Sequence, residues 1–141
     1  MEPQPDRPAT GTATTNGWRI LVVDDEPDML ENVVRILRRT PHRCITAETG
    51  AVALLLVDTE QPDLVLTDLR LPGMDGLALL GAIKRLSPPT PVVIFTAYAS
   101  ESVEKEAVRA GAAGFLVKPF TAAGLLQVIA QALGPGSGPP P

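Results

Sequence analysis

Short apolar runs alternate with longer segments of helical periodicity through the middle of the chain. We interpret the runs as β-strands over residues 18–23, 43–47, 64–67, 92–96 and 115–117. Strands that alternate with helical segments are typical of a parallel sheet with helices packed on its faces. The pattern therefore predicts an α/β fold made of five consecutive strand–helix units, (βα)5.

The helical segments place their apolar residues on one face. In the first segment this spacing of i, i+3, i+4 and i+7 is carried by Leu30, Val33, Val34 and Leu37. Pro27 stands near its first turn, where a missing N–H is harmless. The last helix repeats the stripe at 125–132 behind Thr121, a predicted N-cap. Further helices are expected over 51–58, 76–86 and 100–110, with Gly111 as a C-terminal stop.

The two ends of the chain differ from its middle. Residues 1–17 and 134–141 are rich in Pro, Gly and Thr and contain almost nothing apolar. Such segments bury too little surface to offset the entropy of ordering them, so we expect disordered tails, the second of which also suits a linker. With 141 residues and 45% hydrophobic content, the chain fits one domain of about 100–200 residues, which we place at 18–133.

Charge and composition exclude several classes of function. The net charge of −4 and a pI near 4.9 disfavour direct binding of nucleic acid, which needs a clustered basic surface. No apolar run approaches the ~20 residues of a membrane span, and the N-terminus lacks a signal-peptide core, so we expect a cytoplasmic protein. Cys44 is the single cysteine and is expected to be a buried structural thiol. His42, equally alone, is expected in a surface loop.

Polar residues stand at the ends of four of the five predicted strands. Asp24 and Asp25 follow the first, Asp68 follows the third, Thr96 closes the fourth and Lys118 follows the fifth. In an open parallel sheet the ligand crevice lies at the carboxyl ends of the strands. We therefore expect three carboxylates, a hydroxyl and an ammonium to meet in one crevice.

Three carboxylates in one crevice repel one another, and a bound cation relieves this repulsion. Oxygen donors around an open position suit Mg²⁺, with Mn²⁺ as an alternative, better than they suit zinc. Taken alone, Asp24 and Asp25 are explained as well by an acidic turn that caps a helix. The whole set of polar strand ends favours the metal site.

The same residues provide what phosphoryl transfer to a carboxylate requires: a nucleophile, a metal and fixed donors for the phosphoryl oxygens. Asp68 is the expected nucleophile because it stands alone after a central strand, whereas Asp24 and Asp25 are paired as metal ligands usually are. An acyl phosphate at Asp68 would add about −1.5 to −2 charges, which Mg²⁺, Lys118 and Thr96 can receive.

Four segments, LVVDDEP, LVLTDLRLPGMDG, VVIFTAY and GFLVKPF, resemble the signature segments of the receiver domain of bacterial two-component response regulators, in order and spacing. The resemblance covers about residues 18–133. DLRLPGMDGLALL is most similar to receivers of the nitrogen-regulation type. The resemblance implies a flavodoxin-like strand order of 2-1-3-4-5 and a sensor histidine kinase or phosphotransfer protein as partner. It also implies a signalling module whose only catalysis is its own phosphorylation and slow autodephosphorylation.

By position, the resemblance implies that Asp68 is the phospho-acceptor. Asp25 then ligates Mg²⁺ directly, Asp24 acts mainly through water, and Asp68 and the backbone carbonyl of Arg70 complete the metal site. The resemblance further implies that Thr96 and Lys118 bind the phosphoryl oxygens.

The resemblance also implies moving parts. Phe115 corresponds to the switch aromatic that turns inward when Thr96 moves onto the phosphate. Lys118-Pro119 corresponds to a peptide bond that is usually cis. Arg70 and Tyr98 correspond to the positions beside the path of the hydrolytic water. In related receivers the surface made by the fourth helix, fifth strand and fifth helix exchanges partners on activation, and we expect a phosphorylation-dependent homodimer through it here.

Alternatives remain open from the sequence. A haloacid-dehalogenase-like phosphatase uses similar residues, but it needs a second Asp two positions after the nucleophile, where this chain has Arg70. A receiver-fold module that works without phosphorylation is the other alternative. Phe115 could be ordinary core, and Arg70 and Tyr98 could simply point to solvent.

Overall fold

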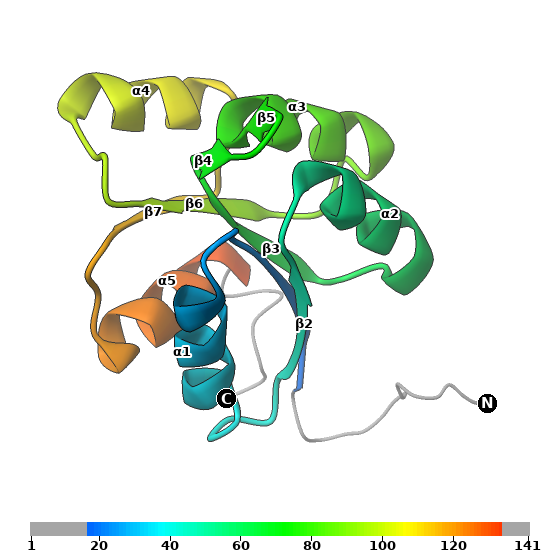
Figure 1. Ribbon diagram of the computed structural model, residues 1–141, viewed down its shortest axis with the longest axis vertical. Helices are drawn as coiled ribbons and strands as arrows, with labels where there is room; N and C mark the ends of the chain where they lie inside the picture. Colours follow the sequence, from blue (N-terminus) through cyan, green and yellow to red (C-terminus); the bar gives the residue numbers. More distant parts are fainter. Residues whose placement is uncertain (1–16, 134–141) are drawn as a thin grey trace.

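The computed structural model describes residues 17–133, and the two predicted tails, apart from residue 17, lie outside this range. Five parallel strands form the main sheet in the order β2-β1-β3-β6-β7 (Figure 1). They are β1 (Arg19–Val23), β2 (Arg43–Ala47), β3 (Leu64–Asp68), β6 (Val92–Thr96) and β7 (Gly114–Val117). The predicted flavodoxin-like order is thereby confirmed.

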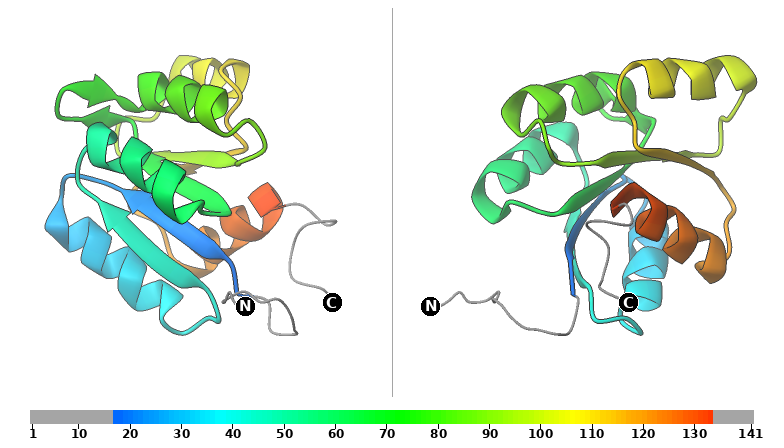
Figure 2. Two further views of the ribbon diagram at one scale, coloured as in Figure 1. Left: turned by 90° about the vertical axis from the view of Figure 1, so that its right-hand side faces the viewer. Right: turned by 180° about the vertical axis from the view of Figure 1, so that it is seen from behind.

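Five helices cover the two faces of the sheet. They are α1 (Pro27–Leu37), α2 (Gly50–Glu60), α3 (Gly76–Leu86), α4 (Glu101–Arg109) and α5 (Ala122–Leu133). α1 and α5 lie on one face, while α2, α3 and α4 lie on the other (Figures 1 and 2). Each layer has its own apolar core, and every residue of β3 and β6 is buried. Strands covered on both faces carry continuous apolar runs, which is why the sequence revealed them clearly.

The predicted boundaries hold to within two residues, and the deviations have local causes. Trp18 was expected to open β1, but its N–H donates to Nδ1 of His42 (3.1 Å), so the ladder begins at Arg19. Asp68 is the last residue of β3, in register with Phe95, rather than the residue after the strand. The hydroxyl of Thr121 accepts the N–H of Gly124, as expected of an N-cap.

A short hairpin that the sequence analysis did not predict follows the third strand of the main sheet. It pairs β4 (Arg70–Leu71) with β5 (Met74–Asp75) in antiparallel fashion. Gly73 makes its turn with a φ of 75°, a conformation that favours glycine. Directly after the hairpin, Gly76 packs so closely that an added Cβ would lie 2.4 Å from the carbonyl oxygen of Asp68. The hairpin therefore holds the chain that follows Asp68 against the start of α3.

The strand order reverses between β1 and β3, because β1 connects to β2 on one side while β3 connects onward to β6 on the other. In open α/β sheets the ligand crevice forms at the carboxyl ends of the strands that flank such a reversal. The ends of β1 and β3 carry Asp24 and Asp68, so the topology brings these two predicted site residues together.

Candidate functional site

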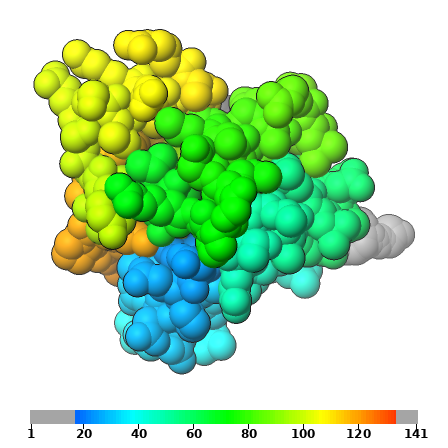
Figure 3. Space-filling model, turned by 45° about the horizontal axis from the view of Figure 1, so that its top comes forward, coloured from blue at the N-terminus to red at the C-terminus, as the bar shows by residue number. Residues whose placement is uncertain are grey.

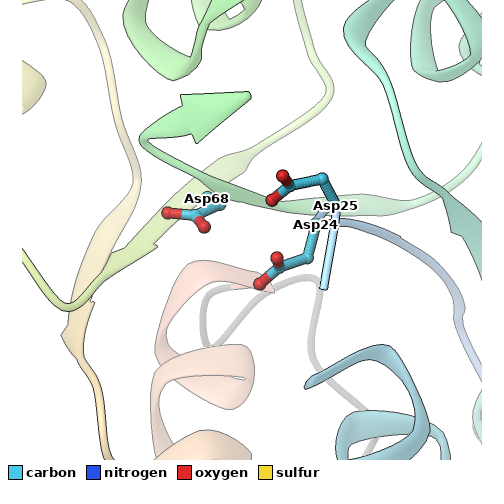
Figure 4. A group of neighbouring side chains, drawn as sticks. All are labelled: Asp24, Asp25 and Asp68. Carbon is cyan, nitrogen blue, oxygen red and sulfur yellow. The ribbon is translucent and has the colours of Figure 1, made fainter. Parts of the chain in front are cut away.

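Three carboxylates lie together at the carboxyl ends of β1 and β3 (Figure 4). One oxygen from each of Asp24, Asp25 and Asp68 lies within 4.8 Å of the others. Asp24 is fully buried and Asp68 is 8% exposed, whereas Asp25 faces solvent. The predicted acidic cluster is therefore present, with one side open. Its donors are all carboxylate oxygens, which suit a hard cation such as Mg²⁺.

Lys118 reaches this cluster from the loop that follows β7, the strand at one edge of the sheet. Its Nζ lies 2.7 Å from Oδ2 of Asp24 and 3.1 Å from Oδ2 of Asp68. Lys118 follows β7, which is separated from β3 by β6, so the side chain crosses above Phe95, with Nζ 4.8 Å from the ring centroid. The side chain is only 9% exposed. The charged amino group of Lys118 therefore lies in the crevice beside two buried carboxylates.

Burial and pairing oppose each other in this cluster. Burial raises the pKa of Asp24, although the bond from Lys118 and the backbone N–H of Glu26 both lower it. Burial lowers the pKa of Lys118, but its hydrogen bonds to Asp24 and Asp68 outweigh that effect, so the pKa of Lys118 is raised above its ordinary value. The ammonium therefore stays protonated and supplies a fixed positive charge.

Backbone hydrogen bonds fix the carboxylates in place. Oδ1 of Asp24 accepts the N–H of Glu26 at 2.9 Å, which turns the chain from β1 into α1. Oδ1 of Asp68 accepts the N–H of Arg70 at 3.3 Å, while its Oδ2 accepts from Lys118. Both oxygens of Asp68 are thereby oriented by groups that come from different loops.

Thr96 ends β6 and is fully buried. Its Oγ1 accepts the N–H of Tyr98 at 2.9 Å, and its carbonyl oxygen accepts the N–H of Lys118. In the parallel ladder Ile94 pairs with Phe115, and alternation puts Thr96 on the same face of the sheet as these two residues. Phe115 is half-buried there. The pair predicted to move together thus lies on one face of neighbouring strands.

Arg70 and Tyr98, which follow Asp68 and Thr96 by two residues each, lie against each other. The guanidinium carbon of Arg70 is 3.9 Å from the centroid of the Tyr98 ring, and both residues are exposed. The space-filling view shows residues of the β4–β5 hairpin in the middle of this face, above the residues that begin α1 (Figure 3). The two residues therefore join the loops that follow β3 and β6.

Three further residues support the site without having been predicted. Oε1 of Glu26 lies 3.8 Å from Nζ of Lys118, Phe95 lies beneath the ammonium, and Gly76 packs against the carbonyl of Asp68. Glu26 could have been suspected because it continues the acidic run of Asp24 and Asp25. The other two depend on contacts between distant segments, which no local pattern reveals.

The single cysteine and the single histidine of the chain lie away from the acidic cluster. Cys44 is half-buried on β2 against the α1–α5 core, and burial raises the pKa of its thiol to about 11, which fits a structural thiol. His42 lies between α1 and β2, as expected, but it is half-buried and accepts a backbone N–H. Burial lowers its pKa against the opposing effect of Asp63.

The fold and the acidic crevice define the class of signalling domain that the sequence resembles. The profile of the response regulator receiver domain family matches residues 20–130, and the chain belongs to this family. A chain of this family is a phospho-acceptor signalling module of two-component systems. The predicted membership is thereby confirmed.

Similar proteins and similar solved structures agree with this family membership. The chain is 39% identical over 122 residues to the response regulator FleR of Pseudomonas aeruginosa, and 41% identical over 101 residues to the regulator NtrC of Escherichia coli. These alignments cover 84% and 72% of this chain but only 26% and 22% of the relatives. The chain thus spans about a quarter of their length, and NtrC bears out the predicted nitrogen-regulation type.

Among solved structures, CheY4 of Vibrio cholerae superposes with a TM-score of 0.78 at 29% identity, covering 82% of this chain and 98% of the other. NtrX of Brucella abortus gives 0.79 at 39% identity, covering 83% of this chain and 27% of the other. Within residues 17–133 no helix is long and apolar enough to cross a membrane. The Lys118-Pro119 bond is cis, as the resemblance implied.

Proposed function

We propose that Asp68 is the phospho-acceptor of this receiver, within a domain that spans residues 18–133. The observation that supports this most is the position of Nζ of Lys118, 3.1 Å from Oδ2 of Asp68 inside the acidic cluster. Asp68 ends the central strand β3 and is slightly exposed, whereas Asp24 is fully buried and held by Lys118 and Glu26. Of these two, Asp68 is the carboxylate that an incoming phosphoryl group can reach.

Asp25, Asp24, Asp68 and the backbone carbonyl of Arg70 would hold Mg²⁺, for which Mn²⁺ is the expected substitute. When bound there, the cation neutralises the carboxylates and the phosphoryl oxygens. Asp25 is the best placed of the carboxylates for direct ligation because it is the most exposed of the three. The buried Asp24, already bonded to Lys118, fits the mainly water-mediated role.

The transfer step uses the chain's own residues. The phosphoryl donor would be a phosphohistidine of the partner protein. A carboxylate oxygen of Asp68 attacks its phosphorus atom, the bond from phosphorus to the imidazole nitrogen breaks, and the imidazole leaves with that electron pair. The product is an acyl phosphate on Asp68. Lys118, already within hydrogen-bonding distance, then donates to a phosphoryl oxygen.

The switch would begin at Thr96. Its Oγ1 now accepts the N–H of Tyr98, and we expect the side chain to turn from this position so that the hydroxyl donates to a phosphoryl oxygen. Space vacated beside Thr96 would lie on the face that carries Phe115, which would turn inward. Both movements alter the surface of α4, β7 and α5, where Val108 and Val117 are exposed. We expect phosphorylation to favour a homodimer through that surface.

The donor would be a sensor histidine kinase or a phosphotransfer protein, and the expected location is the cytoplasm. We expect no direct contact with nucleic acid or with a membrane. We also expect no steady hydrolysis of phosphate esters, because the guanidinium group of Arg70 keeps its protons and cannot act as a general acid. The expected catalysis is confined to the chain's own phosphorylation and the slow loss of that phosphate.

Incubation with acetyl phosphate and Mg²⁺, followed by intact mass measurement, tests this proposal. We expect at most one phosphoryl group per chain and a dependence on the divalent cation. Continuous release of phosphate from an ester substrate would instead support a phosphatase. Sedimentation with and without beryllofluoride tests the dimer, which should tighten with the phosphate mimic, and an unchanged dimerisation constant would refute that part.

A further inference from the structure

Phe95 lies between the strand that carries Asp68 and the strand that leads to Lys118. β6 separates β3 from β7, and Phe95 is in register with Asp68 on one side and with Leu116 on the other. Residues in register across parallel strands point to the same face of the sheet, here the face that α1 and α5 cover. Lys118 follows Leu116 by two residues, so its side chain reaches Asp68 by crossing the position of Phe95.

The ring of Phe95 contacts the ammonium group of Lys118. Nζ lies 4.8 Å from the ring centroid, within the ~6 Å at which a cation is attracted to the face of an aromatic ring. Phe95 is fully buried, and the side chain of Lys118 is 9% exposed. Because little water reaches this pair, the attraction between ring and cation is stronger than it would be at an exposed site.

The hydrogen bonds of Lys118 use only part of its ammonium group. Of the three N–H donors, one is directed to Asp24 at 2.7 Å and one to Asp68 at 3.1 Å. The carboxylate of Glu26 lies 3.8 Å from Nζ, beyond hydrogen-bonding distance, and its side chain is 67% exposed. Without the ring of Phe95, the flexible four-carbon stem of lysine would let the ammonium group move towards this third carboxylate and towards water.

A second ring keeps Phe95 in its orientation. The centroid of Phe120 lies 6.0 Å from that of Phe95, and the ring planes are tilted by 44°. Tilted pairs of this kind are favoured between aromatic side chains. The buried residues around Phe95 are mostly aliphatic, for example Leu125 and Ile129. An aliphatic residue would also fill the core at this position, but it has no ring face to offer to a cation.

We propose that Phe95 is a positioning residue for phosphoryl transfer, because its ring face holds the ammonium group of Lys118 beside Asp68 and away from Glu26. This inference rests on the proposed function, in which Lys118 donates to an oxygen of the phosphoryl group on Asp68. Phe95 acts only through Lys118. It keeps the donor in place before the phosphoryl group arrives, so the ammonium group need not be reoriented during transfer.

Isotope labelling of the lysines tests the ring contact in the full unphosphorylated chain without Mg²⁺. The chain has three lysines, Lys84, Lys105 and Lys118, so NMR can resolve their ε-methylene resonances. Protons above the face of an aromatic ring are shifted upfield. We expect such a shift for Lys118 and its loss in Phe95→Leu, with the resonance then close to that of the exposed Lys105. A Lys118 resonance that does not respond to Phe95→Leu would overturn the proposal.

A second variant separates the charge of the ring from its shape. Phe95→trifluorophenylalanine retains the ring and its packing but removes the negative charge from the ring face. We expect phosphorylation by acetyl phosphate at saturating Mg²⁺ to slow by about three- to tenfold. Mg²⁺ should bind about two- to threefold more tightly, because a released ammonium group repels the metal less. A purely structural role of Phe95 predicts neither change.

Phe120→trifluorophenylalanine is the matched control, because within residues 17–133 this ring contacts Phe95 but no ammonium group. It should change neither the rate nor the affinity. Wild-type behaviour of the fluorinated Phe95 variant, equal effects at both positions, or weaker Mg²⁺ binding would each overturn the proposal. If Asp68 were not the acceptor, the proposed function would fail, whereas the lysine resonances and the Mg²⁺ titration, both measured on unphosphorylated protein, would still decide the role of Phe95.

Discussion

The guanidinium group of Arg70 lies 3.9 Å over the ring of Tyr98. Each of these residues follows a site residue by two positions, Asp68 and Thr96 respectively. The two side chains therefore contact each other rather than pointing separately into solvent. The stack also connects the acceptor loop to the loop whose N–H holds the Thr96 hydroxyl. Arg70 and Tyr98 should consequently act as one unit.

This stack predicts a non-additive effect on the lifetime of the phosphoryl group. Arg70→Ala and Tyr98→Ala should each speed its loss roughly two- to fivefold, because an exposed cation–π contact is worth about 0.5–1 kcal/mol. The double variant should be little faster than either single one, since each change already removes the stack. The measurement is the decay of phosphorylated protein after acetyl phosphate is removed.

Two controls sharpen this test. Tyr98→Phe keeps the ring and should decay like the wild type, and Arg85→Ala removes an exposed arginine from α3 and should have no effect. If the double variant loses phosphate no faster than the wild type, the stack does not shield the site. Fully additive single effects would show that the two side chains act separately.

Lys118 competes with the metal for the carboxylates. Because its ammonium lies 2.7 Å from Asp24 and 3.1 Å from Asp68, a bound Mg²⁺ is repelled by it. Lys118→Met should therefore bind Mg²⁺ more tightly, by about tenfold or about 1.4 kcal/mol. The same variant should accept phosphoryl groups more slowly, because a donor to the transferred oxygens is gone. Calorimetric titration and phosphorylation rates measure the two effects.

Lys105→Met is the matched control, since Lys105 pairs only with Glu101 on the surface of α4 in the described structure. It should change neither property. Weaker Mg²⁺ binding by Lys118→Met would contradict the competition and would mean that the ammonium organises the carboxylates for the metal.

His42 makes stability depend on pH. Burial lowers its pKa below the ordinary 6.5, and its neutral Nδ1 accepts the N–H of Trp18. The unfolded chain then binds a proton near that ordinary pKa while the folded chain does not. The contribution of His42 is therefore complete above the unfolded pKa and is lost as pH falls towards the folded pKa.

His42→Asn offers a similar acceptor that does not titrate. Urea unfolding of both proteins at about pH 7.5 and about pH 5.5 should show a larger loss of unfolding free energy in the wild type. The carboxylates contribute equally to both proteins, so the difference isolates the imidazole. Identical losses would mean that His42 titrates alike in the folded and unfolded chains.

Gly76 has no side chain, and this allows the start of α3 to pack closely against the backbone of Asp68. A Cβ there would lie 2.4 Å from the carbonyl oxygen of Asp68, so Gly76→Ala should lower the free energy of unfolding by about 1–3 kcal/mol and slow phosphorylation. Gly81→Ala in the same helix meets only the flexible end of Arg85, and it should stabilise by about 0.5–1 kcal/mol. Chemical unfolding and phosphorylation rates decide the matter, and equal effects of the two changes would remove this role of Gly76.

The sequence was informative where a periodic pattern or a strand end carried the signal. Continuous apolar runs revealed β3 and β6, and the polar residues that close the strands indicated the crevice of Asp24, Asp68 and Lys118. The β4–β5 hairpin was not predicted from the sequence, because strands of two residues are too short to show a periodic pattern. The contact between Arg70 and Tyr98 was not predicted either, because it joins two loops whose distance from each other depends on the packing of the sheet.

The most direct test identifies the residue that carries the phosphoryl group. Borohydride reduces an acyl phosphate to an alcohol, so treatment after acetyl phosphate and Mg²⁺ should convert Asp68 to homoserine, located by peptide mass spectrometry. We expect this change at Asp68 alone, its loss in Asp68→Asn, and slower labelling at the same residue in Asp25→Asn. Modification of Asp24, Asp25 or any other residue in the unmutated protein would contradict the assignment of Asp68 as the phospho-acceptor.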